Sequence, residues 1–146
     1  MIICAGRNEV FPFADAIGVG LIESAINLTR ICLFNKPEYL LFIGSAGSYG
    51  NHQVFDIVES KRASNIELGF LTQSAYTPLD NVLESENKFA RNDTIVNSSN
   101  YISTNETLCK EFLDYGVGIE NMEFFSVLSV AKEFEIPVAG IFIVTN

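Results

Sequence analysis

The chain has 146 residues, 48% of them apolar, and a formal net charge of −9 from 9 Lys and Arg against 18 Asp and Glu. A chain of this length suits one globular domain that buries roughly 70% of its unfolded surface, which excludes a mostly disordered protein. The acidic balance argues against a nucleic-acid partner, because binding phosphates needs clustered Lys and Arg, and only Lys61-Arg62 lie side by side. We therefore expect a single domain over residues 1–146.

The cysteines and the apolar segments bear on where the protein resides. Cys4, Cys32 and Cys109 lie far apart among apolar residues and form no C-x-x-C pattern, which favours buried free thiols in a reducing compartment. The apolar start lacks a basic region, unlike a signal peptide, and no segment approaches the ~20 apolar residues of a membrane helix. We expect a cytoplasmic protein with no membrane partner.

Short apolar runs and amphipathic stretches alternate along the first half of the chain. Residues 2–5 are a β-branched run ended by glycine, which predicts a buried strand, and 11–17 predicts a short extended piece whose pairing a proline limits. Apolar residues spaced by three and four positions predict a helix over 21–35. The continuous apolar run 39–43, closed by a glycine, predicts a strand buried on both faces.

The second half begins less regularly. Residues 53–68 alternate and carry charge, which predicts a longer strand leaving the core, and 70–93 predicts a loop or weak helix. A strand over 94–96 precedes a helix opened by a capping box at Ser103 and ended by Gly116. A strand over 117–120, a helix over 122–134 and a strand over 138–144 complete the chain. This alternation predicts an α/β fold with a mostly parallel or mixed sheet between helices.

Two glycine-containing segments are candidate ligand sites. Gly18-Val19-Gly20 opens a helix, but the third glycine of a dinucleotide fingerprint is missing, so a simple tight turn is the favoured interpretation. Residues 44–48, Gly-Ser-Ala-Gly-Ser, follow the most apolar strand, where ligands collect in open α/β sheets. Small residues there let backbone N–H groups approach an anion or a ribose; an ordinary turn of small residues remains the alternative.

Carboxylates follow two of the predicted elements. Glu123 lies on the apolar stripe of its helix with Val127 and Phe134, so its carboxylate should point toward the interior or a cleft. There it could grip the paired hydroxyls of a sugar through charge-assisted hydrogen bonds, or simply interact with the helix dipole. Glu9 follows the first strand together with Arg7, an arrangement that is usually solvated. His52 is predicted to be a loop residue with no catalytic role.

The chain resembles the superfamily of purine nucleoside phosphorylases and methylthioadenosine/S-adenosylhomocysteine nucleosidases. The resemblance rests on five blocks in the family's order. These are Gly18-Val19-Gly20, residues 41–48 followed by 54–58, residues 97–102, Asn121-Met122-Glu123 and residues 141–146. It implies a three-layer α/β/α sandwich around a mixed, partly barrel-like sheet.

The resemblance also implies roles for individual residues. Met122 and Glu123 match the ribose-binding pair, preceded by Asn121, with Glu123 taking the 2′- and 3′-hydroxyls. Tyr101 and Ile102 match positions that line the purine. Ser45, Ala46 and Gly47 match the segment at the sugar and at the phosphate or nucleophilic water. Glu9 falls on the glutamate that activates water in nucleosidases, and Arg7 lies near the phosphate-binding arginine of phosphorylases.

Departures from the family pattern are equally specific. Asn146 stands where the family has an aspartate that protonates purine N7; an amide can donate a hydrogen bond to N7 but cannot transfer a proton usefully near pH 7. The arginine that phosphorylases carry before the glycine-rich segment is replaced by Phe42. The family's C-terminal helix is also absent from the chain.

These residues together predict cleavage of the N-glycosidic bond of a purine nucleoside, with hydrolysis favoured over phosphorolysis. The alternative is a catalytically impaired relative that binds nucleosides without turnover. We expect no metal or cofactor, with phosphate as co-substrate only if the protein is a phosphorylase. The resemblance further implies a homodimer or higher homo-oligomer.

Overall fold

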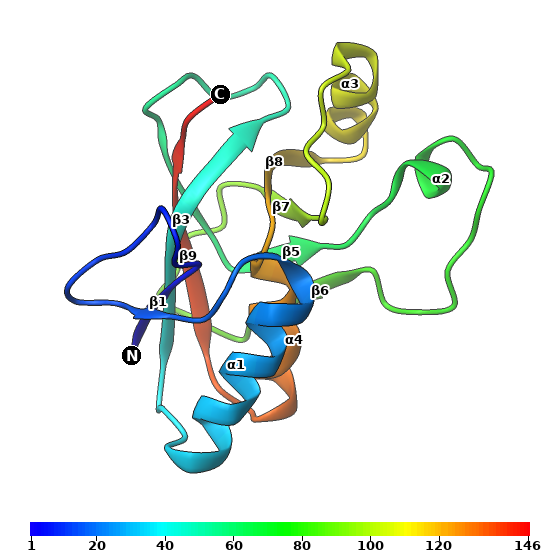
Figure 1. The fold of residues 1–146 in the computed structure, drawn as a ribbon. Helices are drawn as coiled ribbons and strands as arrows, with labels where there is room; N and C mark the ends of the chain where they lie inside the picture. Colours follow the sequence, from blue (N-terminus) through cyan, green and yellow to red (C-terminus); the bar gives the residue numbers. More distant parts are fainter.

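A mixed nine-stranded sheet forms the centre of the computed structural model, which describes residues 1–146 (Figure 1). In chain order the elements are β1 (Ile2–Cys4), β2 (Asp15–Ala16), α1 (Gly20–Phe34), β3 (Leu40–Ser48), β4 (Ile57–Ser60), β5 (Arg62–Ser64), α2 (Leu68–Leu71), β6 (Val82–Glu84), β7 (Ile95–Ser98), α3 (Glu106–Asp114), β8 (Val117–Asn121), α4 (Phe124–Glu133) and β9 (Val138–Val144). The α/β class and the mixed sheet are confirmed; the sheet does not close into a barrel.

Strand β3 joins the two parts of the sheet. It runs parallel to β9 from Leu40 opposite Val138 to Ala46 opposite Val144, and parallel to β1 on its other edge. Past that point its last residues pair antiparallel with β8, and β8 continues through β7 and β5 to β6. Because β3 belongs to both parts, residues at its end lie beside the ends of β8 and β9.

Helices cover both faces of the β7–β8 region. Helices α1 and α4 pack against each other, and α4 lies over the main core cluster, which contains Val96 and Ile119. On β7 and β8, Ile95 pairs with Val117 and Val96 with Ile119, so Gly118 is the extra residue of a β-bulge. The bulge sends Val117 to the opposite face, where a second cluster packs beneath α3.

Three of the expected elements differ from the structure. The apolar run at 39–43 does not end at Gly44: β3 continues to Ser48, since β9 and then β8 supply partners for its backbone groups. The single strand expected over 53–68 is two short strands, β4 and β5, which pair with different neighbours. The helix expected to open at Ser103 begins at Glu106, where the Asn105 side chain accepts hydrogen bonds from the Thr107 and Leu108 amides.

Two further expectations also differ, and the others agree closely. The stretch 70–93, expected as a loop or weak helix, contains strand β6, because β5 supplies antiparallel backbone partners for it. The last strand spans Val138–Val144 as expected, and Gly116, with φ of +87°, ends α3 in the left-handed conformation. Only residues 15–16 of the extended piece at 11–17 form a strand. The three cysteines are free, and Cys4 and Cys32 are buried. None of the four helices has the length and apolarity needed to cross a membrane.

Candidate active site

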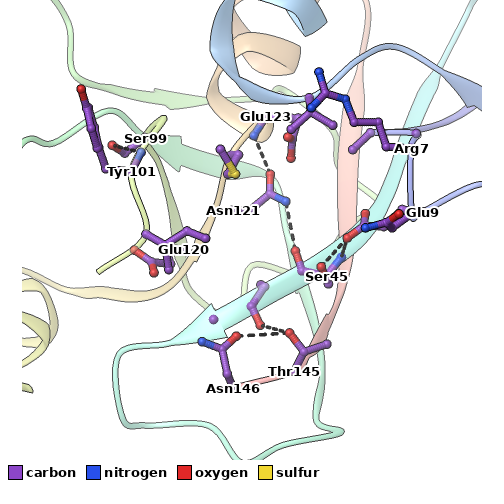
Figure 2. Close-up of a pocket in the computed structure, with 18 residues that line it drawn as sticks. Arg7, Glu9, Ser45, Ser99, Tyr101, Glu120, Asn121, Glu123, Thr145 and Asn146 are labelled. Atoms are coloured by element: carbon purple, nitrogen blue, oxygen red, sulfur yellow. Dashed lines mark hydrogen bonds between the residues drawn. The ribbon is translucent and has the colours of Figure 1, made fainter. Parts of the chain in front are cut away.

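A cavity of about 360 Å³ opens where the ends of β1, β3, β8 and β9 meet the N-termini of α1 and α4. All site residues predicted from the sequence line it: Arg7, Glu9, Ser45, Ala46, Gly47, Tyr101, Ile102, Asn121, Met122, Glu123 and Asn146. Figure 2 shows Glu9 and Ser45 on one side of the cavity and Tyr101 and Glu120 on the other. The fold thus brings together residues that lie up to 139 positions apart, from Arg7 to Asn146; their individual roles remain predictions.

Glu9 is held by a tight turn and by Ser45. The Glu9 amide donates to the Gly6 carbonyl at 3.0 Å, and Gly6 adopts φ of +95°, a conformation that favours glycine. Its carboxylate oxygen Oε1 accepts from the Ser45 hydroxyl and from the Ser45 amide at 3.3 Å. The second oxygen, Oε2, is buried without a hydrogen-bond partner. Glu9 is therefore fixed in the site with one free acceptor, not solvated as such a loop acid usually is.

The Gly44–Ser48 segment contributes to the site as part of a strand. A Cβ on Gly44 would lie 2.9 Å from Cε1 of Phe42 and 3.2 Å from Oε2 of Glu9, so the glycine is what lets the Glu9 carboxylate lie against β3. Phe42 itself is fully buried and packs with Phe124 and Phe142, with ring centroids 5.8 Å away in each case. The position where phosphorylases carry an arginine is therefore part of the hydrophobic core.

Glu123 is 3% exposed and precedes the first residue of α4. Its carboxylate does not cap its own helix; Oε1 accepts from the Gly20 amide at the start of α1, at 2.8 Å. Burial raises the pKa of Glu123, the hydrogen bond from Gly20 lowers it, and the charge of Glu9 raises it further. The two carboxylates therefore interact electrostatically across one site.

The Asn121 side chain links Glu123 and Ser45 through hydrogen bonds. Its Oδ1 accepts from the amides of Glu123 at 2.9 Å and Phe124 at 3.0 Å, while its Nδ2 donates to the Ser45 carbonyl at 3.0 Å. Both ends of the side chain are thus bonded to protein. In this structure Asn121 positions the two walls of the cavity, although it also lines the space available to a ligand.

The Gly18-Val19-Gly20 segment is a tight turn and not an anion cradle. The three amides at the start of α1 are already bonded: Val19 to Glu23 at 2.9 Å, Gly20 to Glu123 at 2.8 Å, and Leu21 to Asn100 at 3.0 Å. Gly18 and Gly20 both have positive φ, as the turn requires. The interpretation favoured from the sequence is confirmed, and the turn serves to orient Glu123.

The far end of the cavity carries aromatic and amide groups. Tyr101 and Ile102 are 85% and 64% exposed, so they form a rim over which a flat ring could stack. Asn146 lies beside Gly47: a Cβ on Gly47 would be 3.3 Å from its Nδ2. The Asn146 Oδ1 accepts from the Thr145 hydroxyl at 3.2 Å, which leaves the amide N–H groups free to donate.

Arg7 and Glu120 are two further charged residues that line the cavity. Arg7 is exposed, and its guanidinium lies 3.6 Å from Glu23. Glu120, on β8, lines the same cavity but was missed by sequence reasoning. The sequence carries a signal for Glu120: it is a charged residue next to an apolar run, near the end of a predicted strand and two residues before Met122. His52, as expected, lies in a loop and does not line the cavity.

Comparisons with known proteins place this fold among nucleosidases. No family model and no curated protein sequence matches the chain. Among solved structures, the chain is similar to the 5′-methylthioadenosine/S-adenosylhomocysteine nucleosidase (MTAN) of Helicobacter pylori, with a TM-score of 0.79 at 15% identity over 99% of this chain and 86% of that one. The chain therefore has the α/β fold of these enzymes.

Two further structures support the same fold. Futalosine hydrolase of Helicobacter pylori matches with a TM-score of 0.80 at 15% identity, over 99% of this chain and 86% of that one. The MTA/SAH nucleosidase of Streptococcus pneumoniae, solved in complex with 8-aminoadenine, matches with a TM-score of 0.75 at 14% identity, over 98% of this chain and 83% of that one. The structural neighbours thus include MTA/SAH nucleosidases, which the resemblance names, and futalosine hydrolase, which it does not.

Proposed function

We propose that the protein hydrolyses the N-glycosidic bond of a purine nucleoside. The observation that carries the proposal is the pair of carboxylates in one cavity, Glu123 buried at one side and Glu9 at another with an unpartnered oxygen. Cleavage of this bond passes through a cationic, oxocarbenium-like sugar, and preorganised negative charge stabilises such a transition state. The nucleosidase names of the structural neighbours support the same reaction.

The geometry suggests how the reaction proceeds. Glu123 accepts hydrogen bonds from the ribose 2′- and 3′-hydroxyls, and Glu9 accepts a proton from a water that attacks C1′. The bond between C1′ and N9 breaks, its electron pair goes to the purine, and the free base takes up a proton from solvent. Asn146 donates a hydrogen bond to the purine N7 and thereby stabilises the leaving base without transferring a proton.

Charge in the cavity favours water over phosphate as the nucleophile. Three carboxylates line the cavity, those of Glu9, Glu120 and Glu123, against one cation, Arg7. Arg7 is exposed and already paired with Glu23, and the alternative arginine position is the buried Phe42. A phosphate dianion would therefore meet net repulsion where a water would not.

Product analysis tests the proposal. The protein is incubated with adenosine, inosine and 5′-methylthioadenosine, with and without inorganic phosphate, and free base and sugar are separated by chromatography. We expect free base and the unphosphorylated sugar from at least one nucleoside, at a rate that phosphate does not increase. Base release that requires phosphate would indicate phosphorolysis, and no release under any condition would refute the enzymatic proposal.

A second candidate, nucleoside binding without turnover, is favoured by one residue. Asn146 places an amide, which is not a useful acid, at the end of the cavity where the base would leave. One of the similar structures is an aspartate-to-asparagine mutant of MTAN with 5′-methylthioadenosine in its active site. Calorimetry that detects nucleoside binding, together with no base release over hours, would establish this second function instead.

A further inference from the structure

One face of the sheet formed by β3, β9 and β4 carries no helix. The opposite face packs against α4, and its side chains, among them Phe42 and Phe142, belong to the main core cluster. Figure 1 shows the helices to the right of β3 and β9 and none to the left. On β9 the residues that alternate with the core positions include Ile141 and Ile143, which are 37% and 42% exposed. Strand β9 is thus apolar on both faces but covered on one, whereas strands of this composition are normally buried on both.

Apolar side chains from three strands meet on this uncovered face. Ile43 of β3 lies directly opposite Ile141 in the strand register. Ile57 of β4 lies directly opposite Ile143. Together with Phe11 these four side chains line a groove of about 240 Å³. The groove makes one continuous apolar surface out of residues from the start, the middle and the end of the chain.

The apolar area of this surface is that of a protein interface. Ile57 is 70% exposed, and Phe13, whose ring centroid lies 5.6 Å from that of Phe11, is 64% exposed. The six side chains together expose apolar surface on the order of 500 Å², which is as large as the largest patch of a typical monomer. A homodimer interface of about 800 Å² per partner that is about 65% apolar requires a similar apolar area.

Few charges border the uncovered face. Glu59 lies on the same side of β4 as Ile57, opposite Ile141, and its carboxylate pairs with Arg91 at 3.1 Å. Glu9, at one end of the groove, is bonded to Ser45. Each chain has a net charge of −9, so two copies repel each other least where their contact surfaces are uncharged. A twofold axis brings the same surface of both copies together, and an apolar, uncharged face is complementary to itself.

We propose that this face is the interface of a homodimer, in which two copies pack their sheets face to face about a twofold axis with Ile57 and Ile143 in the contact. Sheets that pack in this way lie about 10 Å apart and interdigitate their side chains. This interface does not depend on the proposed reaction, but Glu9 and Ser45 line both the groove and the cavity, so the second copy borders the candidate active site.

Helix α1 offers a competing apolar surface and therefore the matched control. Ile22 on α1 is 71% exposed, almost the same as Ile57 at 70%, and it does not line the groove. Sedimentation velocity over a range of chain concentrations up to about 100 μM gives the mass of the assembly and its dissociation constant. The proteins compared are the wild type, Ile57→Lys, Ile143→Lys and Ile22→Lys, each at low and at high salt.

We expect the wild type to sediment with twice the chain mass of 16.1 kDa and a dissociation constant of about 10 μM or tighter. Ile57→Lys and Ile143→Lys each place two charges in the apolar contact and should raise this constant about 100-fold or more. Ile22→Lys should leave it unchanged. High salt should lower it for the wild type, because salt screens the repulsion between two chains of charge −9.

Three results would overturn the proposed interface. A wild type that stays monomeric at about 100 μM shows that this face does not hold a second copy. An assembly of any size that survives Ile57→Lys, or that Ile22→Lys dissociates equally well, uses another surface. A dissociation constant that rises with salt indicates a contact made by ion pairs. If the lysine variants do not fold, Ile57→Thr decides: it keeps the β-branched shape that strands prefer and must still raise the dissociation constant at least about threefold.

Discussion

Glu123 is subject to opposing requirements at a single position. To accept two sugar hydroxyls its carboxylate must be ionised, yet its side chain is buried and shares the cavity with the charge of Glu9. The Gly20 amide compensates in part by donating directly to Oε1. We expect the ionised residue to lower the stability of the ligand-free protein at neutral pH, a cost that the proposed ribose-binding role would explain.

Replacing Glu123 with Gln should stabilise the protein in a pH-dependent way. The pKa of Glu123 is raised above its ordinary value of 4.5, so the folded state binds the proton more tightly than the unfolded state. Its contribution to stability is therefore fully present below pH 4.5 and is lost as pH rises through the raised pKa. The free energy of unfolding of Glu123→Gln should match that of the wild type at acid pH and exceed it at pH 7, as measured by urea denaturation across this range.

The same substitution should weaken nucleoside binding at pH 7, because a neutral amide makes weaker hydrogen bonds to hydroxyls than a carboxylate does. A Glu123→Gln protein that gains no stability at neutral pH would show that the carboxylate is not strained in the free protein. If the Glu123→Gln protein also binds nucleosides as tightly as the wild type, Glu123 does not bind the ribose.

Asn146→Asp should increase base release if the amide limits the reaction. The new carboxyl group would border the space above Gly47 together with the Glu120 side chain, and a like charge nearby raises the pKa of a carboxyl, which favours the protonated form that can act on N7. General-acid help is worth roughly 10²- to 10⁴-fold, so we expect kcat/KM to rise by about 100-fold. Asn146→Ala, which removes the donor without adding an acid, serves as the matched control and should lower kcat/KM.

At the scale of the elements, the sequence predicted strands and helices well where one local pattern decided the outcome. The strand Val138–Val144 and the helix Gly20–Phe34 follow from an apolar run and a helical periodicity. The continuation of β3 through Gly44–Ser48 could not be predicted, because small residues form a strand there only when β9 and β8 supply partners. The break between β4 and β5 likewise depends on which neighbours each strand pairs with.

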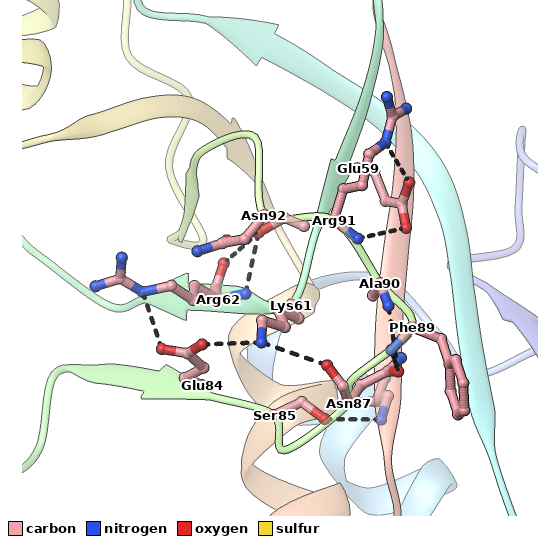
Figure 3. Close-up of polar contacts among 12 residues, drawn as sticks. Glu59, Lys61, Arg62, Glu84, Ser85, Asn87, Phe89, Ala90, Arg91 and Asn92 are labelled. Carbon is pink, nitrogen blue, oxygen red and sulfur yellow. Dashed lines mark hydrogen bonds and ion pairs between the residues drawn. The ribbon is translucent and has the colours of Figure 1, made fainter.

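The irregular segment after β6 is fixed by polar contacts rather than by a repeating pattern (Figure 3). The Asn87 side chain is 2% exposed; its Nδ2 donates to the Tyr39 hydroxyl at 2.6 Å, and its Oδ1 accepts from the amides of Phe89 and Ala90. Nearby, Lys61 forms an ion pair with Glu84 at 3.2 Å and donates to the Asn87 carbonyl at 3.3 Å. Such long-range bonds carry no periodic signal in the sequence.

Asn87→Ala should therefore destabilise the fold without changing the site. The substitution leaves the Phe89 and Ala90 amides and the Tyr39 hydroxyl without their partner, which should lower the free energy of unfolding by about 2 kcal/mol. Lys88→Ala, at the adjacent exposed position, is the control and should have little effect. Nucleoside affinity below the unfolding transition should stay at the wild-type level, and a loss of affinity would mean that this segment influences the cavity.

At the scale of the whole molecule, the acidic character of the chain is present in the site as well. Carboxylates outnumber cations in the cavity, as they do in the whole sequence with 18 Asp and Glu against 9 Lys and Arg. The resemblance found from sequence blocks correctly indicated the fold. In that fold, every residue chosen from the sequence lines the same cavity. The resemblance missed Glu120, because it rests on matched blocks and this acid lies just outside the Asn121-Met122-Glu123 block. The expected homodimer or higher homo-oligomer remains a prediction that light scattering can test.

The contribution of Glu9 to base release tests the central claim most directly. Rates are compared for wild type, Glu9→Gln and Glu59→Gln, since Glu59 is a partly buried carboxylate outside the cavity, bonded to Arg91 (Figure 3). If Glu9 activates the attacking water, Glu9→Gln should lose about 100-fold or more in kcat/KM, while Glu59→Gln keeps the wild-type rate. A Glu9→Gln protein that releases base as fast as the wild type would contradict the account.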